Sequence, residues 1–270
     1  GSNHSKERVS NSLDEKFSSA HREGRIHIHD LEAYGESYNC LTPDLVKGFP
    51  YDEINDNSDV YKIMEIFYYL KKIVIGLGNE QSGGIGFGNF DCDMNDIFTK
   101  LDIGLNEETR RILEKNLDLF MRWNHEARDR CGQVQYYLTF NLGLSTTEIG
   151  RFVTESVLTL FMNSDYIHPN IIFKVKNGIN RNKGDKNYDL FELAKKCTAK
   201  KMIPTYYLAD SEHNQKIDSY KISLMGCRSK VYQNQFGEDT TIGKSNIVYT
   251  SINLPRIAFD INEQFPDFSL

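Results

Sequence analysis

The sequence has few cysteines, and it lacks the spacing that would assign them to a familiar site. Only five cysteines occur in 270 residues, and none forms a CxxC pair. Disulfide frameworks and tetrathiolate metal sites need paired, regularly spaced cysteines, so neither explains these thiols. The chain also has no apolar run of about 18 residues and no signal-peptide pattern, so we expect no membrane partner. Unpatterned cysteines fit a reducing compartment, and we expect a cytoplasmic protein.

An excess of positive charge is absent as well. The chain carries 38 acidic and 32 basic residues, for a net charge of −6. Binding of a nucleic-acid polymer depends on a basic face that releases counterions, and this balance argues against such a partner. Binding of single nucleotides remains compatible with this charge balance, because a few local hydrogen-bond donors are enough to bind them. The charged fraction of 26% and the hydrophobic fraction of 39% are those of an ordinary globular protein.

Repeats, low-complexity tracts and Pro/Gly-rich linkers are missing too, so nothing in the sequence divides the chain. The first two residues read as a cloning remnant. Residues 3–19 are polar without periodicity, and we expect them to form a mobile or partly helical N-terminal segment. We assign residues 20–270 to a single domain.

Apolar residues at three- and four-residue intervals predict four helices. The first spans about 59–77 and is apolar around much of its circumference. The second begins after the N-cap Asn106, the third opens with a capping-box spacing of Ser145 and Glu148, and the fourth runs from Asp189 to about Lys200. Strand-like runs lie between and after these helices, at 136–142, 171–176, 202–207 and 247–252. Strands that alternate with helices predict an α/β fold.

One cysteine stands out by its surroundings, in Met225-Gly226-Cys227-Arg228-Ser229. Gly226 permits the unusual backbone of a tight loop, and a strand-like run follows downstream. A cysteine in such a turn suits a redox or radical centre, but most cysteines outside disulfides are small buried hydrophobic residues. The residues by themselves leave this choice open.

Several further motifs occur in a fixed order along the chain, and together with the Cys227 segment they resemble one family, the anaerobic (class III, glycyl-radical) ribonucleoside-triphosphate reductases. The resemblance covers roughly residues 20–260. The motifs are Ala20–Leu31, Asn39-Cys40-Leu41, Asn79–Gly84, Thr139–Leu144, Phe173–Asn180, Asp189–Pro204 and the block from Cys227 through Gly243-Lys244-Ser245-Asn246 to Ala258. The resemblance implies a ten-stranded α/β barrel, of which this chain would supply the first half.

The same resemblance implies the roles of four residues. Cys227 matches the thiyl-radical residue that removes the 3′-hydrogen of the ribose, and Cys40 matches the second active-site thiol. Ser229 and Asn246 match positions that line the substrate pocket, although a serine and an asparagine in turns also serve as ordinary caps. Cys92, Cys131 and Cys197 fall outside the matching catalytic motifs and are expected to be packing or surface residues.

Two other patterns suggest sites that we do not favour. His27-Ile28-His29-Asp30 places two imidazoles on one side of a strand, but a zinc site needs a third ligand, and we expect no metal here. Gly83-Gly84-Ile85-Gly86-Phe87-Gly88 resembles a phosphate-binding loop. A dinucleotide loop follows a strand, whereas this stretch follows a helix, which leaves a nest of amides near the substrate triphosphate as the remaining binding hypothesis.

Several parts that the family implies have no counterpart in these 270 residues: a regulatory nucleotide-binding cone, a four-cysteine zinc site and a glycyl-radical loop with an Arg-Val-x-Gly-Tyr-like sequence. We therefore expect no cofactor in this chain and no activity of the chain alone. The resemblance implies ribonucleoside triphosphates, effector nucleotides and a radical-SAM activating enzyme as partners, with formate or a dithiol as reductant. The chain would be a truncated form, a proteolytic product or a short homologue.

The resemblance also implies a homodimer. The family packs helices from the region of residues 59–77 against their own copies, where effector nucleotides bind, so we expect Phe67 and Leu70 at that interface and Lys71 and Lys72 near effector phosphates. Two alternatives stay open. One is a regulatory nucleotide-binding homologue without the chemistry, and the other is a different glycyl-radical enzyme, which the paired NC and MGCRS motifs disfavour.

Overall fold

The computed structural model describes residues 2–35, 37–127, 136–225, 232 and 235–264. Contacts divide the chain into two compact units. The first unit consists of Gly1–Asn39 with Asn246–Leu270, and the second of Cys40–Ser245. The expected boundary at residue 19 falls inside a helix of the first unit, Glu15–Arg22, and the assignment of domains stays a prediction.

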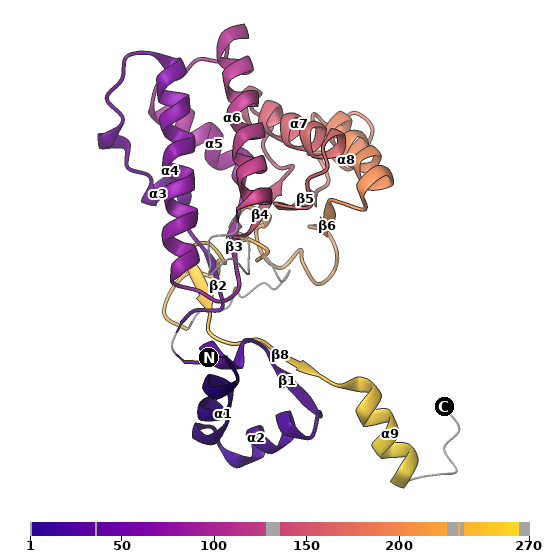
Figure 1. The fold of residues 1–270 in the computed structure, drawn as a ribbon. Coiled ribbons are helices and arrows are strands. Elements are labelled where there is room, and N and C mark those ends of the chain that lie inside the picture. Colours follow the sequence, from indigo (N-terminus) through magenta and orange to yellow (C-terminus); the bar gives the residue numbers. More distant parts are fainter. Residues whose placement is uncertain (1, 36, 128–135, 226–231, 233–234, 265–270) are drawn as a thin grey trace. The chain divides into compact units, whose positions relative to one another are not determined.

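The first unit joins the beginning of the chain to its end (Figure 1). Its strands β1 (Ile26–Ile28) and β8 (Thr250–Ile252) pair antiparallel, with Ile26 opposite Ile252. The polar N-terminal segment is helical, and β8 confirms the last three residues of the strand expected at 247–252. The helices of this unit are α1 (Ser2–Ser12), α2 (Glu15–Arg22), η1 (Leu31–Ala33) and α9 (Leu254–Gln264).

The second unit is built on a six-stranded sheet of order β6-β5-β4-β3-β2-β7. The pairs from β2 to β6 are all parallel, as expected when helices connect consecutive strands. The strands are β2 (Cys40–Thr42), β3 (Gly84–Phe87), β4 (Tyr137–Leu142), β5 (Asn170–Val175), β6 (Thr205–Leu208) and β7 (Lys244–Asn246), whose last residue belongs to the first unit.

Helices of the second unit gather on one side of these strands (Figure 1). They are α3 (Leu45–Gly48), η2 (Tyr51–Glu53), α4 (Asp59–Asn79), α5 (Phe90–Lys100), α6 (Glu107–Glu126), α7 (Glu148–Asn163) and α8 (Tyr188–Lys201), and a 3-10 turn η3 (Ser219–Lys221) follows β6. In the part of the chain that the structure describes, no helix combines the length and the apolar character needed to cross a bilayer. The α/β fold class is confirmed.

All four predicted helices are present, and one predicted cap is wrong. Asn106 caps α6 as expected: its Oδ1 accepts from the Thr109 amide at 3.0 Å, and Thr109 Oγ1 accepts from the Asn106 amide at 2.8 Å. For α7 the cap is Thr147, whose Oγ1 accepts from the Gly150 amide at 3.2 Å. Ser145 lies two residues too early and bonds the Thr147 hydroxyl instead.

Strand residues alternate between two chemically different faces, because successive side chains of a strand point to opposite sides. One face packs against the helices and is apolar. It carries Ile85 and Phe87 of β3, Leu138, Phe140 and Leu142 of β4, and Ile171, Phe173 and Val175 of β5. Apart from Ile172, the opposite face is small or polar, and we call it the polar face. It carries Cys40 and Thr42, Gly84 and Gly86, Thr139 and Asn141, and Ile172 and Lys174.

Helix α4 is only partly covered by its own unit. Phe67 and Leu70, expected at a dimer interface, are buried in the core, where the Phe67 ring lies 6.0 Å from that of Phe120 on α6. That expectation is therefore wrong for these two residues, since they face α6 and not solvent. The exposed apolar side chains of α4 are Tyr61, Met64, Tyr68 and Ile75.

Candidate functional site

Cys40 lies at the start of β2 on the polar face and is 2% exposed. Its Sγ accepts a hydrogen bond from the Gly84 amide of β3 at 3.3 Å. The thiol is thus held against the neighbouring strand within the sheet. A sulfur in this position is shielded from water and fixed in orientation, which suits a thiol that must act on a bound molecule.

The glycine-rich stretch after α4 forms strand β3 and not a phosphate-binding loop. A side chain at Gly86 would meet the carbonyl of Leu224 and the hydroxyl of Ser223, both at 2.9 Å from its Cβ. At Gly88, a Cβ would lie 2.1 Å from Ile242. These glycines therefore allow the segment around residues 223–224 to approach the backbone of β3 closely.

Strand β3 brings two of the predicted motifs together. Gly84 contacts the Cys40 sulfur and Gly86 contacts Leu224, only three residues before Cys227 in the sequence. Residues two apart on a strand are separated by roughly 7 Å. Cys227 and Ser229 themselves lie outside the described residues, so their predicted roles stay predictions.

Asn246 ends β7 and pairs with Asn39, the residue directly before Cys40. The Asn39 amide donates to the Asn246 carbonyl at 2.8 Å, and Asn246 Nδ2 donates to Asn39 Oδ1 at 3.2 Å. Asn39 Nδ2 in turn donates to Asp30 Oδ2 at 2.7 Å. The structure thus joins the Asn-Cys motif to the Lys244-Ser245-Asn246 motif, although the role of Asn246 toward substrate stays a prediction.

Two polar residues of the motifs, for which no role was predicted, also lie on the polar face. Asn141 of β4 donates to the carbonyls of Phe87 at 3.0 Å and Leu224 at 3.1 Å, and it accepts from the Leu224 amide at 2.9 Å. Lys174 of β5 is completely buried. A signal for both exists in the sequence, because each is a strongly polar residue with an apolar residue on either side in a strand-like run.

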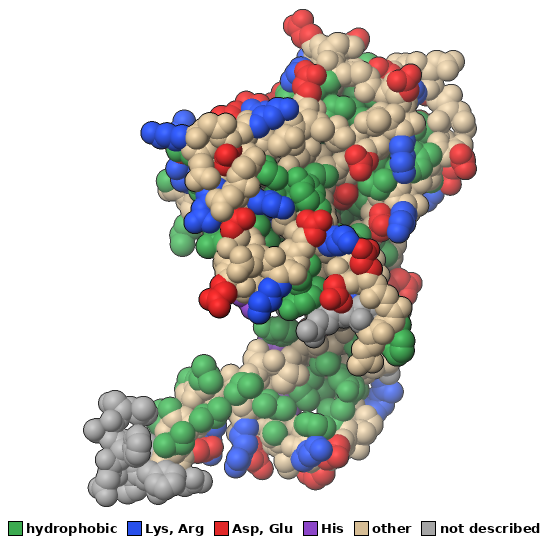
Figure 2. All heavy atoms as spheres, turned by 180° about the vertical axis from the view of Figure 1, so that it is seen from behind, with side chains coloured by type: hydrophobic (Ala, Val, Ile, Leu, Met, Phe, Trp, Pro, Cys, Tyr) green, Lys and Arg blue, Asp and Glu red, His purple; other side chains and the backbone are tan. Residues whose placement is uncertain are grey.

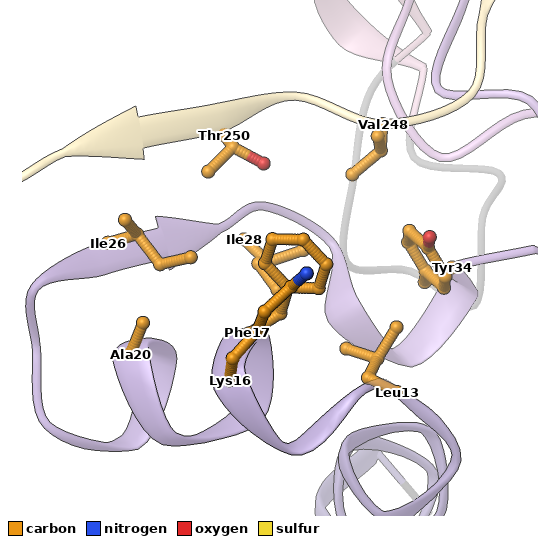
Figure 3. A pocket seen from close by; sticks show the side chains of 9 residues that line it. All are labelled: Leu13, Lys16, Phe17, Ala20, Ile26, Ile28, Tyr34, Val248 and Thr250. Atoms are coloured by element: carbon orange, nitrogen blue, oxygen red, sulfur yellow. The ribbon is translucent and has the colours of Figure 1, made fainter.

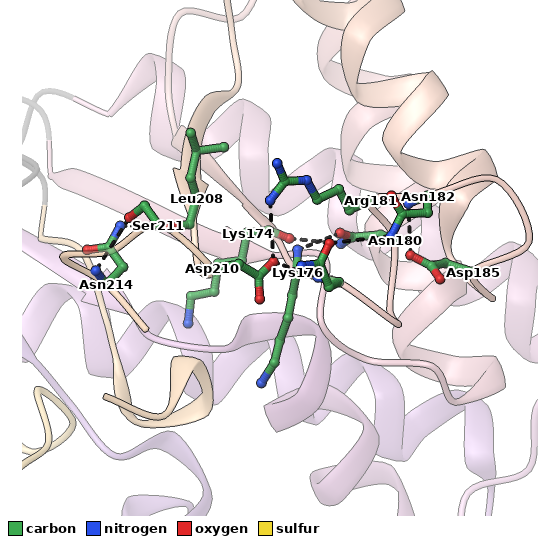
Figure 4. A network of polar contacts seen from close by, with 11 residues as sticks. Lys174, Lys176, Asn180, Arg181, Asn182, Asp185, Leu208, Asp210, Ser211 and Asn214 are labelled. Atoms are coloured by element: carbon green, nitrogen blue, oxygen red, sulfur yellow. Dashed lines mark hydrogen bonds and ion pairs between the residues drawn. The ribbon is translucent and has the colours of Figure 1, made fainter. Parts of the chain in front are cut away.

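Buried polar side chains also fix the loops at the carboxyl ends of β4 and β5. Asp91 Oδ2 accepts from the amides of Gly143 and Ser145, each at 2.9 Å. Asn180 Nδ2 donates to the carbonyls of Gly143 and Lys174, each at 2.8 Å. Figure 4 shows the polar contacts that adjoin this network, in which Asn180 is bonded to the backbone of Lys174 and Lys176. Ligands of parallel sheets bind at the carboxyl ends of the strands, where this network lies.

The cysteines outside the motifs have the properties of structural residues. Cys197 is fully buried on α8, and burial raises the pKa of its thiol to about 11. Burial, followed by the nearby Asp91 and Asp93, also raises the pKa of Cys92. Both thiols stay protonated at neutral pH and are poor nucleophiles. Cys131 lies outside the described residues.

Three histidines of the first unit form a small aromatic group. The rings of His21 and His27 lie 5.4 Å apart, and those of His27 and His29 lie 4.6 Å apart. His21 Nδ1 accepts from the Ile28 amide at 3.1 Å, and His29 Nε2 bonds the Ser251 hydroxyl at 2.8 Å. Within the described ranges, no three His, Cys, Asp or Glu side chains are placed to hold a metal ion.

A separate cavity of about 550 Å³ opens in the first unit. Figure 3 shows Phe17 and Ala20 of α2, Ile26 and Ile28 of β1 and Thr250 of β8 around it, with Lys16 as its charged member. On the face seen in Figure 2, acidic and basic side chains are interspersed over the second unit, and hydrophobic side chains reach the surface of both units.

Comparison with known proteins identifies one family. The family model for the anaerobic ribonucleoside-triphosphate reductase matches residues 1–269. The reductase of Escherichia coli K12 is 27% identical over 89% of this chain and 38% of its own length. That of bacteriophage T4 is 27% identical over 91% of this chain and 46% of its own. The chain thus spans less than half the length of these curated relatives.

Solved structures give the same result for the fold. The anaerobic ribonucleotide reductase from Thermotoga maritima, in complex with dATP and CTP, matches with a TM-score of 0.61 at 15% identity. The match covers 96% of this chain and 48% of that one. The same reductase with citrate in its active site gives a TM-score of 0.58. The α/β architecture is thus the first half of the barrel that the sequence predicts, and the chain belongs to the anaerobic ribonucleoside-triphosphate reductase family.

Proposed function

We propose that this chain is the N-terminal part of the catalytic barrel of an anaerobic ribonucleoside-triphosphate reductase. Its parent would convert ribonucleoside triphosphates to 2′-deoxyribonucleotides by thiyl-radical chemistry, and so supply DNA replication. The observation that carries the proposal is the convergence at β3. There the Cys40 sulfur and the segment leading to Cys227 meet glycines two positions apart on one strand.

In the proposed reaction, the Cys227 sulfur radical takes the 3′-hydrogen of the ribose and becomes a thiol. Cys40 donates a proton to the 2′-hydroxyl, which leaves as water. Two electrons then come from formate, which leaves as CO2, or from a dithiol, which becomes a disulfide; C2′ takes up a proton and the Cys40 thiolate is reprotonated. The hydrogen atom returns from Cys227 to C3′, which restores the sulfur radical. Ser229 and Asn246 orient the ribose through neutral hydrogen bonds. A glycyl radical in the rest of the parent protein would supply the unpaired electron when present.

Partners follow from the same proposal. A radical-SAM activating enzyme would generate the glycyl radical, structural zinc would bind the rest of the parent, and effector nucleotides would regulate it. The parent would form a homodimer through the exposed face of α4 that carries Tyr61, Met64 and Tyr68. A reducing compartment such as the cytoplasm would keep the thiols of Cys40 and Cys227 available.

The decisive experiment replaces Cys227 in the full-length parent. After anaerobic activation, Cys227→Ala should abolish formation of deoxynucleotides while the glycyl-radical signal in electron paramagnetic resonance persists, because the substitution removes only the hydrogen-abstracting sulfur. Cys197→Ala serves as the control, since Cys197 lies in the core and not on the polar face. Turnover by the Cys227 variant would refute the assignment.

A further inference from the structure

Lys174 is a fully buried lysine on the polar face of β5, where its ammonium group is surrounded by oxygen atoms. Its Nζ donates to the carbonyl of Gly88 at 2.8 Å and to Asn89 Oδ1 at 2.6 Å. The same nitrogen donates to the carbonyls of Ser219, at 2.9 Å, and Ile222. Two of these four acceptors therefore belong to the segment of residues 219–225.

A buried charge is costly, and a lysine is rarely enclosed without a specific task. Burial lowers the pKa of Lys174 to about 8, while the nearby Asp91, Cys92 and Asp93 raise it. The ammonium form therefore prevails at neutral pH and offers three N–H donors to the four oxygens. An apolar side chain of the same length would fill this space without desolvating a charge, so packing by itself does not explain Lys174.

Other side chains also bind the segment of residues 219–225. Their hydrogen bonds take the place of the backbone hydrogen bonds that a neighbouring strand would supply. Asn141 binds both the amide and the carbonyl of Leu224. The Ser223 amide donates to Thr241 Oγ1. Lys176 Nζ donates to Ser219 Oγ at 3.0 Å. The segment is thus tied by side chains up to Leu224, the residue directly before Met225, and Met225 is itself completely buried.

We propose that Lys174 is a positioning residue, which, with Asn141 beside it, fixes residues 219–224 and so sets where the Cys227 sulfur lies. This inference rests on the proposed function, in which the sulfur must be held close to one ribose hydrogen. A displacement of about 1 Å at a reacting atom costs on the order of 10²-fold in rate. The lysine touches no substrate and acts through the backbone that it holds.

The first test measures the anchor directly, in this chain and without reference to catalysis. Lys174→Met removes the four hydrogen bonds and keeps an unbranched side chain that is only one atom shorter. Hydrogen exchange at the amides of Ser223 and Leu224 should become roughly tenfold faster or more, while exchange in α7 stays unchanged. Lys201→Met is the matched control, because Lys201 is a half-buried lysine that binds the Ser164 carbonyl far from this segment in the sequence.

The second test uses the full-length parent after anaerobic activation. Lys174→Met should lower kcat by about 10²-fold with little change in KM and an unchanged amount of glycyl radical. A purely structural lysine would lower the amount of folded, activated enzyme and leave kcat per radical unaltered. Unchanged exchange at Ser223 and Leu224, or an unchanged kcat per radical, would overturn the proposal.

If Lys174→Met does not fold, Thr241→Val provides a milder test of the same segment. Thr241→Val keeps the shape of a buried side chain and removes the acceptor for the Ser223 amide, together with the weaker bond that the hydroxyl donates to the Lys221 carbonyl at 3.3 Å, so it should speed exchange at Ser223 and lower kcat in the same direction. No change in either quantity would contradict the anchoring. The exchange experiment stands even if Cys227→Ala retains activity, so failure of this inference and failure of the proposed function are distinguishable.

Discussion

At the scale of single residues, glycines and buried polar side chains decide how closely chain segments approach on the polar face. Gly86 has no side chain because the Leu224 carbonyl and the Ser223 hydroxyl occupy the space where one would lie. Asn141 and Lys174 then bind the backbone that passes there. Cys40 lies on the same face. The thiol proposed to act on the substrate is therefore surrounded by glycines, which allow close approach, and by side chains that hold the backbone through hydrogen bonds.

Gly86→Ala tests this close approach. The new methyl group would lie 2.9 Å from a backbone carbonyl, so we expect a loss of about 1–3 kcal/mol in the free energy of unfolding. Gly76→Ala is the matched control: no atom lies within 4 Å of its Cβ position, and alanine should stabilise α4 by about 0.5–1 kcal/mol. Denaturant unfolding of both variants measures the difference. Equal stabilities of the two variants would show that residues 223–224 move aside for the added methyl group at little cost.

Cys40→Ser tests the second thiol. A hydroxyl fits the site and still accepts from the Gly84 amide, but it supplies no sulfur chemistry, so the activated full-length parent should lose at least about 10²-fold in kcat. Cys92→Ser, at a half-buried thiol on α5, should retain near-normal turnover. Equal activities of the two variants would remove Cys40 from the proposed mechanism.

At the scale of elements, α4 presents two different apolar faces. Ile63, Phe67 and Leu70 pack into the core, whereas Tyr61 and Tyr68 are more than half exposed, at 58% and 61%. Large apolar side chains gathered on one helix face are typical of an interface. The spacing of apolar residues in the sequence shows that α4 has a wide apolar surface. It does not show which part of that surface packs against α6 and which part is exposed.

Tyr68→Glu should therefore yield a folded monomer, because it places a charge in the proposed dimer contact and leaves the core intact. Leu119→Glu, at an exposed apolar residue of α6, should leave the dimer unchanged. Leu70→Glu, in contrast, should unfold the protein, since it buries a charge. Sedimentation and circular dichroism distinguish these outcomes. A Tyr68 variant that remains dimeric would exclude this face as the contact.

At the scale of the whole molecule, the chain corresponds to less than half of each reductase that it matches. It covers 38% of the Escherichia coli reductase and 46% of the phage T4 enzyme. Its 270 residues hold no Arg-Val-x-Gly-Tyr-like sequence that could carry a glycyl radical. Cys40 and the segment before Cys227 are in place, but nothing recognisable in the chain would generate the radical.

The purified chain should therefore form no deoxynucleotide, even with the activating enzyme, reductant and a ribonucleoside triphosphate present. Radioactive substrate and product chromatography provide a sensitive assay. The activated full-length parent is the positive control, and its Cys227→Ala variant sets the background. Deoxynucleotide formation above that background by the chain alone would contradict the proposal.

The sequence by itself determined the family, the fold class and the main helices, because ordered motifs and apolar periodicity are local signals. Asn106 is predictable as the N-cap of α6 for the same reason, because a cap depends on neighbouring residues in the sequence. Short strands such as β2 and β7 are not predicted from the sequence, since three residues carry little periodicity and pair only where a distant partner lies beside them.

Tertiary structure decided which residues meet. It placed Thr147 and not Ser145 at the start of α7, turned the glycine-rich stretch into a buried strand, and moved Phe67 and Leu70 into the core. It also gave Asn141 and Lys174 their partners, which lie 54–83 residues from Asn141 and 45–86 residues from Lys174 in the chain. Hydrogen bonds and close packing depend on distances between atoms in space, and a linear sequence does not contain those distances.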